Sequence, residues 1–130
     1  MRTNRQGRNI KQLIGHLVDS ASNNHQRLVR LQYAVTPVFP DYTFENDVWI
    51  SVQHYQQEDW YELVQLWKYY NLHLAHVISH TDQGWLNNEW TNGSSDPISL
   101  RDIIFNYMAH LTLHLNEIEQ LICLQVESDV

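Results

Sequence analysis

The stretch LRDIIFNYMAHLTLHLNEIEQ, residues 100–120, repeats apolar side chains every three or four positions. This repeat continues to about Val126 and predicts one long amphipathic helix. Ser99 and Asp102 mark its start, because a polar cap followed three positions later by an acidic residue is typical of a helix N-terminus. The apolar face comprises Leu100, Ile103, Ile104, Tyr107, Met108, Leu111, Leu115, Ile118, Leu121 and Ile122.

Two further segments show the same period and predict long helices over residues 10–32 and 60–80. Each begins after a similar pair, Asn9 with Gln12 and Asp59 with Glu62. The apolar arc of the second helix comprises Trp60, Leu63, Val64, Trp67, Tyr70, Leu74, Val77 and Ile78.

The segments between these helices predict a short helix and loops. Residues 47–55 fit a short helix with Trp49 and Val52 turned inward. Residues 35–40 contain two prolines and cannot be helix interior. Residues 81–97 are rich in turn formers, and no segment alternates as a strand does. The fold class is therefore all-α, with three long helices and a short one in a single domain over residues 1–130.

The composition limits the partners of this domain. The chain has 130 residues, of which 43% are hydrophobic and 18% charged, as in a globular protein. Its net charge of −7 argues against nucleic acid or an anionic membrane as the main partner. No run approaches the ~20 apolar residues that span a bilayer. With one cysteine, Cys123, and no secretory segment, we expect a cytoplasmic protein. The basic residues Arg2, Arg5, Arg8 and Lys11 suggest a solvated N-terminal end.

His110 and His114 lie one helical turn apart inside the apolar arc of the last helix. Each ring nitrogen needs a partner once water is excluded. Two imidazoles at positions i and i+4 point the same way, which suits two ligands of one metal ion. Core histidines held by ordinary hydrogen bonds would show the same pattern.

The first helix offers a third imidazole. Its predicted core face comprises Ile14, Leu17, Val18, Ala21 and Leu28, and a polar stripe of His16, Ser20, Asn23 and Arg27 runs beside that face. A solvated helix edge would give the same stripe. However, metal sites in bundles are built from side chains on facing helices, so His16 could meet the histidine pair in a groove.

A rival group lies on the second long helix. His73, His76 and His80 share a face opposite the apolar arc, so we expect them to be exposed. An exposed group lacks buried outer contacts to hold its rings, so any metal there would be adventitious. His25 and His54 have no partner that the sequence identifies.

Several segments together resemble the DinB-like (YfiT-like) superfamily of metal-binding helical bundles. They are GHLVDSASNNHQR at 15–27, FPDY at 39–42, VQHYQ at 52–56, LVQLWKYYNLHLAHVI at 63–78 and the stretch at 100–120. The most specific signal is GHL-x-DS paired with the late H-x-x-x-H. The resemblance implies a helical bundle in which His16, His110 and His114 bind one divalent metal ion.

The same resemblance carries expectations about assembly. Members usually have a further long helix before the GHL helix, and we expect that this helix is absent here or that the chain is a shortened version. The open groove that this would leave favours pairing with a second copy, so we expect a homodimer.

Relatives include thiol-dependent transferases and proteins described as metal-dependent hydrolases. The resemblance thus implies a metal-dependent enzyme of one of these types, acting on a small molecule. Imidazole ligands favour zinc or nickel, with iron or manganese as alternatives. Asn23 and Arg27 are candidates for outer contacts or substrate binding, and no catalytic base is identified. A non-catalytic bundle, acting through oligomerisation or as a metal-stabilised binding or sensing module, is the alternative.

Two smaller expectations concern pH and aromatic residues. Imidazole binds a metal only when deprotonated, so metal affinity should decrease as the pH falls through ~6.5. Tyr42, Trp49 and Tyr55 either line the mouth of a pocket or pack as core aromatics under a loop.

Overall fold

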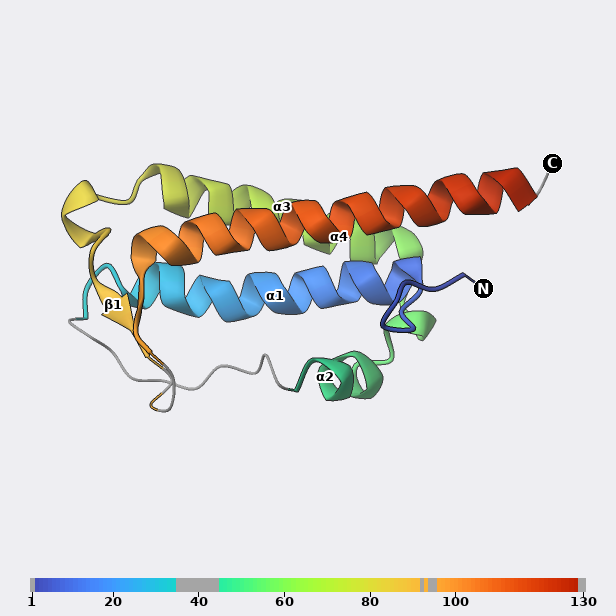
Figure 1. Cartoon of the computed structure of the whole chain (residues 1–130), viewed down its shortest axis with the longest axis horizontal. Coiled ribbons are helices and arrows are strands. Elements are labelled where there is room, and N and C mark those ends of the chain that lie inside the picture. Colours follow the sequence, from blue (N-terminus) through green and yellow to red (C-terminus); the bar gives the residue numbers. More distant parts are fainter. Residues whose placement is uncertain (1, 35–44, 92, 94–95, 129–130) are drawn as a thin grey trace.

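The computed structural model describes residues 2–34, 45–91, 93 and 96–128. Three long helices dominate the fold: α1 (Ile10–Arg30), α3 (Trp60–Ser79) and α4 (Leu100–Ser128) (Figure 1). A short helix, α2 (Asn46–Val52), and the 3-10 turns η2 (Tyr55–Gln57) and η3 (Gln83–Trp85) connect them. The three long helices and the short one are confirmed. None of the described helices is long and apolar enough to cross a membrane.

The predicted caps account for where the long helices begin. Asn9 and Gln12 form a reciprocal capping box at the start of α1. The Asp59 side chain accepts a hydrogen bond from the Glu62 backbone N–H at the start of α3. Ser99 Oγ accepts one from the Asp102 N–H, at 3.2 Å, at the start of α4. Each contact satisfies an N–H that the first helical turn leaves without a partner.

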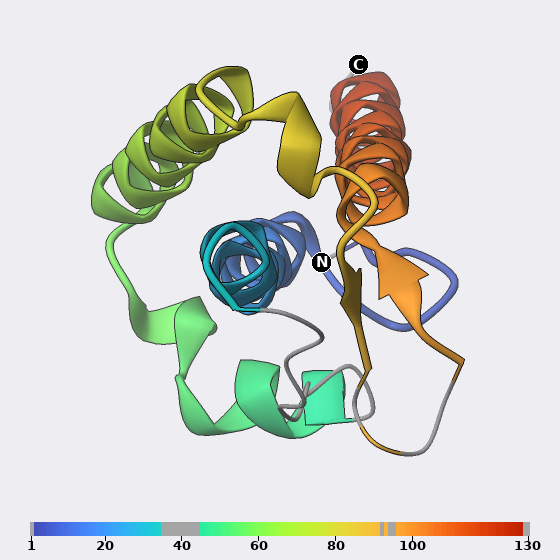
Figure 2. The same cartoon turned by 90° about the vertical axis from the view of Figure 1, so that its left-hand side faces the viewer.

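Helix α1 lies at the centre of the molecule. Viewed along the helices, α3 and α4 flank it on one side and α2 lies on the other (Figure 2). The core residues of α1 pack into two clusters along its length, one around Leu17 and Leu63 and the other around Leu28 and Leu74. The predicted core face of α1 is buried as expected. This central position makes α1 the element against which every other helix is placed.

Several predicted orientations are wrong, and the packing explains why. Val52 is 64% exposed, because α2 turns Ile50 rather than Val52 toward α1. Trp60 is 49% exposed and Met108 is 52% exposed. Helices α3 and α4 pack mainly on α1 rather than on each other, so each buries a narrower stripe than its apolar arc suggests. Residues 35–40 and Tyr42 lie outside the described residues.

The predicted loop over residues 81–97 contains a small strand that the sequence pattern did not show. β1 (Glu89–Trp90) pairs antiparallel with β2 (Ile98–Ser99), with Glu89 opposite Ser99 and Trp90 opposite Ile98. Two-residue strands are too short to produce a visible alternation of apolar and polar residues. The pair brings Trp90 into the core beside Leu28, where it is 2% exposed.

Candidate metal centre

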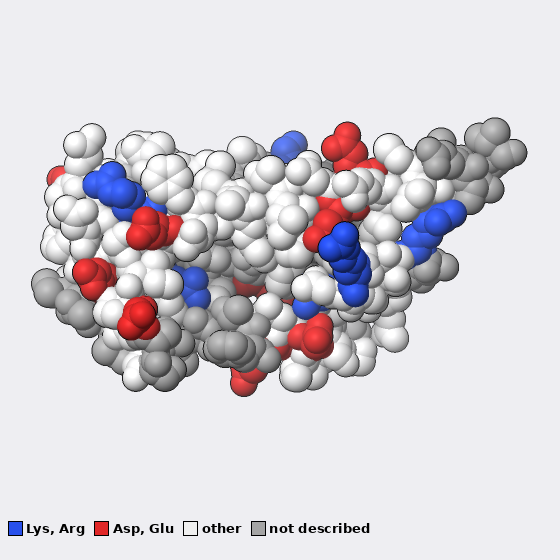
Figure 3. Space-filling view, in the orientation of Figure 1, with Lys and Arg blue, Asp and Glu red and all other residues white. Residues whose placement is uncertain are grey.

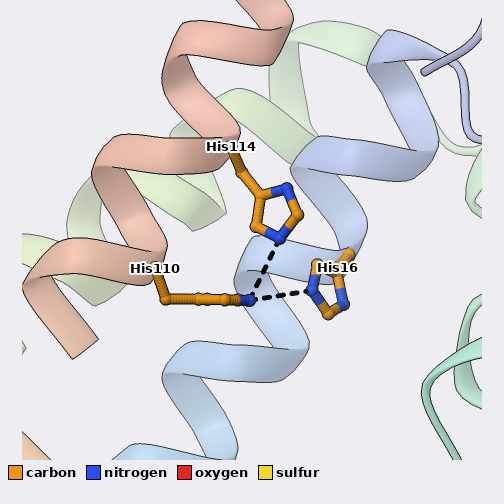
Figure 4. A group of neighbouring side chains, drawn as sticks. All are labelled: His16, His110 and His114. Carbon is orange, nitrogen blue, oxygen red and sulfur yellow. Dashed lines mark hydrogen bonds between the residues drawn. The ribbon is translucent and has the colours of Figure 1, made fainter. Parts of the chain in front are cut away.

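Three imidazole rings from two helices meet between α1 and α4 (Figure 4). His16 comes from α1 and is 3% exposed, and His114 comes from α4 and is 4% exposed. The half-buried His110 lies between them: its Nε2 is 3.3 Å from Nε2 of His16 and 3.0 Å from Nε2 of His114. The structure therefore brings together the three predicted ligand residues, and they could hold a metal ion.

The two distances from His110 Nε2 to the neighbouring Nε2 atoms fit a single small cation. A tetrahedral ion with metal–nitrogen bonds of about 2.05 Å sets its ligand nitrogens about 3.3 Å apart. The three rings are nearly perpendicular to one another, with interplanar angles of 74°, 86° and 83°. Rings that meet edge-on can direct their in-plane lone pairs at one point. The donor set, three neutral nitrogens, suits zinc or nickel.

Hydrogen bonds among the rings do not account for the cluster as well as a cation does. His114 Nδ1 lies 3.3 Å from Glu117 Oε2, and a carboxylate there favours the proton on Nδ1. Nε2 of His114 is then an acceptor, so a single N–H of His110 would have to serve both neighbouring rings. A metal ion would use all three lone pairs at once.

Burial keeps two of the rings neutral. It lowers the pKa of His16 to about 3, with smaller contributions from the Arg8 charge and the other two histidines. Burial also lowers the pKa of His110 to about 4, again with repulsion from His114 and Arg8. At neutral pH both rings therefore carry free lone pairs, which is the state that binds a metal.

Arg8 corrects the expectation of a solvated basic end. Its side chain is 9% exposed, and its Nη2 lies 3.1 Å from Oδ1 of the exposed Asp47 on α2. Its Nη1 donates to Gln6 Oε1 at 3.2 Å. Pairing between the N-terminal segment and α2 explains the burial, which the sequence could not show because 39 residues separate the partners. The Arg8 charge is close enough to contribute to the lowered pKa values of His16 and His110.

A polar cavity of about 290 Å³ adjoins the histidines. His16 and His110 form part of its wall, as do Asn106 and Tyr107 of α4 and Asn46 of α2. The rest of the wall comes from α1, through Asp19, Ser20, Asn23, Asn24 and Arg27. Such a volume lies near the lower limit of ~300 Å³ for small-molecule sites. The cavity is therefore large enough for a small ligand and lies directly against the candidate metal ligands.

Both candidate binding residues lie in the wall of this cavity. Asn23 is 8% exposed. The Arg27 guanidinium stacks on the Trp90 ring, 4.2 Å from its centroid, and donates to Asn24 Oδ1 at 3.3 Å. These contacts hold a planar cation in a fixed orientation. Arg27 is the one Lys or Arg in the described lining.

Asp19 is a cavity residue to which the sequence assigned no role. It is 6% exposed, and its Oδ1 accepts hydrogen bonds from Tyr55 Oη at 2.6 Å and Gln53 Nε2 at 2.8 Å. Burial raises the pKa of this carboxyl group, although both donors act against the shift. In the sequence Asp19 is the Asp of the GHL-x-DS motif, but its hydrogen-bond partners, Gln53 and Tyr55, lie more than 30 residues away.

Tyr55 and the histidines outside the candidate site differ in burial and in their contacts. Tyr55 is 4% exposed and packs in the core cluster around Leu17, so it is a core aromatic rather than part of a pocket mouth. His73, His76 and His80 are exposed, as predicted. His25 does have a partner, contrary to expectation: its Nδ1 lies 2.8 Å from Tyr70 Oη of α3.

Charges are mixed on the face of the molecule drawn in Figure 3. On the face drawn in Figure 3, Lys and Arg side chains alternate with Asp and Glu rather than forming a continuous basic patch.

Comparison of the chain with models of protein families, with curated proteins and with solved structures finds no match. The site itself is therefore the basis for a functional proposal.

Proposed function

We propose that His16, His110 and His114 hold one divalent metal ion, and that the protein is a metal-dependent enzyme acting on a small molecule in the adjoining cavity. The observation that carries this proposal is the convergence of three Nε2 atoms, two of them on histidines in the wall of a polar cavity. Zinc or nickel is the expected ion, with iron or manganese as alternatives. The resemblance to DinB-like proteins supports the same three ligands.

The chemistry follows from the ligand set. Three protein ligands leave a coordination position for water, a thiol or substrate, and the bound ion then acts as a Lewis acid. His16 and His110 would hold the ion beside the cavity, while Arg27 and Asn23 bind and orient the substrate. A fixed guanidinium in a polar wall favours a substrate with a carboxylate or another anionic group. Transfer to or from a small thiol, or hydrolysis, are the reaction types proposed.

A non-catalytic bundle is the second candidate, and exposed apolar side chains favour it. Several large ones lie on α3 and α4: Tyr61 at 70%, Tyr69 at 61%, Leu72 at 55%, Phe105 at 68% and Leu113 at 54% exposed. Where such side chains form one contiguous patch, they mark an interface between proteins. Under this alternative the chain forms a homodimer through α3 and α4, and the metal stabilises the fold.

Metal analysis of protein purified without an affinity tag tests the proposal. Wild-type protein should carry close to one ion per chain, His110→Ala should lose it, and His73→Ala should keep it. Metal in His110→Ala, or its loss in His73→Ala, would refute the site. Thermal melts before and after chelation then separate the candidates: an intact fold without metal favours catalysis, and collapse favours a structural role.

A further inference from the structure

The three histidines differ in whether their Nδ1 atoms have a hydrogen-bond partner. His110 Nδ1 lies 3.3 Å from Ser20 Oγ, and His114 Nδ1 lies 3.3 Å from Glu117 Oε2. His16 Nδ1 is buried and has no hydrogen-bond partner among the described residues. In Figure 4 this nitrogen points away from the other two rings. A metal-binding histidine almost always donates its second ring N–H to an acceptor, so one acceptor is missing.

A buried acceptor without a partner lies one helical turn away. Asp19 Oδ2 has no hydrogen-bond partner among the described residues, although the residue is 6% exposed. His16 and Asp19 both belong to α1, and residues three apart on a helix have Cβ atoms about 5–6 Å apart. Burying a polar atom without a hydrogen bond costs free energy. The two atoms are complementary, because a neutral imidazole protonated on Nδ1 is a donor and a carboxylate oxygen is an acceptor.

We propose that Asp19 is a positioning residue for the metal site: its Oδ2 accepts a hydrogen bond from His16 Nδ1–H when an ion is held at Nε2. This inference rests on the proposed metal-binding function. The ion needs the lone pair of Nε2, so the ring proton must be on Nδ1. A carboxylate at that nitrogen fixes this tautomer and makes the imidazole a stronger ligand. Glu117 would do the same for His114.

The surroundings of Asp19 use one carboxylate oxygen and leave the other. The Tyr55 ring packs so closely against Gly15 that a Cβ added there would lie 2.2 Å from it. Tyr55 Oη and Gln53 Nε2 both donate to Oδ1, which leaves Oδ2 for another donor. Gly15, His16 and Asp19 lie within five consecutive residues of α1. This short segment therefore contains the candidate ligand, its proposed acceptor and the glycine that leaves room for the Tyr55 ring.

Zinc affinity, measured by competition with a chromophoric chelator, tests this role. Asp19→Asn should bind zinc about 10- to 100-fold more weakly than wild type, the usual cost of losing such an outer contact. Tyr55→Phe is the matched control, since it removes a donor to Oδ1 and leaves Oδ2 intact. Its zinc affinity should stay within about three-fold of wild type, whatever it does to stability. Circular dichroism of both variants without metal checks that they fold.

A spectroscopic measurement separates positioning from a general loss of structure. In ¹⁵N-correlated NMR spectra of the zinc-loaded wild type, His16 should carry its proton on Nδ1, with slow exchange and a downfield shift. Asp19→Asn should lose that protected signal. Wild-type zinc affinity in Asp19→Asn, or an unchanged His16 signal, overturns the role of Asp19 alone. A wild-type protein that binds no zinc overturns both this inference and the proposed function.

Discussion

Two groups of three histidines in this chain have similar ring spacings and different ring orientations. In the exposed group, ring centroids are 6.2 Å apart for His73 and His76 and 4.2 Å for His76 and His80. In the buried group, the corresponding distances are 5.2, 4.9 and 4.4 Å. The interplanar angles differ: 20° and 35° in the exposed group, against 74° to 86° in the buried one. Proximity alone therefore does not make a candidate metal site.

The difference lies in how the rings are turned. In the exposed group neighbouring rings lie nearly face to face, so their in-plane lone pairs do not point at one atom. The other group takes two rings from α4, which meet edge-on, and a third from α1 that is edge-on to both. Within the described part of the chain, His16, His110 and His114 are the one group of three His, Cys, Asp or Glu residues close enough together to hold a metal ion.

The largest expected effect is on metal-dependent stability. Zinc at about 1,000 times its dissociation constant should stabilise wild-type protein by about 4 kcal/mol, because only the folded state binds it. This is an increase in Tm of roughly 10 °C or more for a domain of this size. His114→Ala should abolish the increase in a thermal melt, and His76→Ala should keep it. An equal increase in Tm in both variants would mean that zinc binding needs His114 no more than it needs His76.

A second test concerns the packing that supports only the buried group. Gly15→Ala would place a Cβ 2.2 Å from the Tyr55 ring, so Tyr55 would have to move away from Asp19. Overpacking of this kind lowers the free energy of unfolding by about 1–3 kcal/mol. Denaturant unfolding of the metal-free protein measures it. The control, Gly84→Ala, adds a Cβ 3.3 Å from an oxygen of the exposed Asp82 side chain and should change stability by less than about 0.5 kcal/mol.

The contrast between these elements shows how far the sequence alone could lead. The long helices follow from apolar periodicity, and their starts follow from Asn9, Asp59 and Ser99, because both signals are local. The three metal-ligand candidates came from adding a family resemblance to the i, i+4 spacing of His110 and His114. The contacts of Arg8 with Asp47 and of Asp19 with Tyr55 were missed. Each joins residues more than 30 positions apart, so it depends on how the helices pack.

Acid should destabilise the metal-free protein through the buried histidines. Their folded-state pKa values, about 3 for His16 and about 4 for His110, lie below the unfolded value of ~6.5. Above pH 6.5 both states are neutral and this contribution is absent. Below it the unfolded state binds protons first, so the free energy of unfolding falls by up to about 1.4 kcal/mol per pH unit for each histidine.

Urea melts between pH 6.5 and 5 measure this slope. His110→Gln should make it shallower, because one buried base is removed. The same change at the exposed His76 is the control and should leave the slope as it is in wild type. A His110→Gln slope as steep as that of the wild type would show that burial does not keep the His110 ring neutral.

The smallest expected effect concerns a serine–histidine contact, of which each histidine group has one. Ser20 Oγ lies 3.3 Å from His110 Nδ1, and Ser79 Oγ lies 3.1 Å from His80 Nδ1. Ser20 belongs to α1 and contacts His110 of α4, which helps to orient a candidate ligand. Ser20→Ala should therefore weaken zinc binding about 10-fold, the lower end for such contacts. Ser79 is exposed at the end of α3, and its oxygen also donates to the His76 carbonyl. Ser79→Ala should therefore leave zinc affinity unchanged in the chelator competition. If both serines mattered equally, the exposed histidines would take part in metal binding after all, and the distinction between converging and stacked rings would fail.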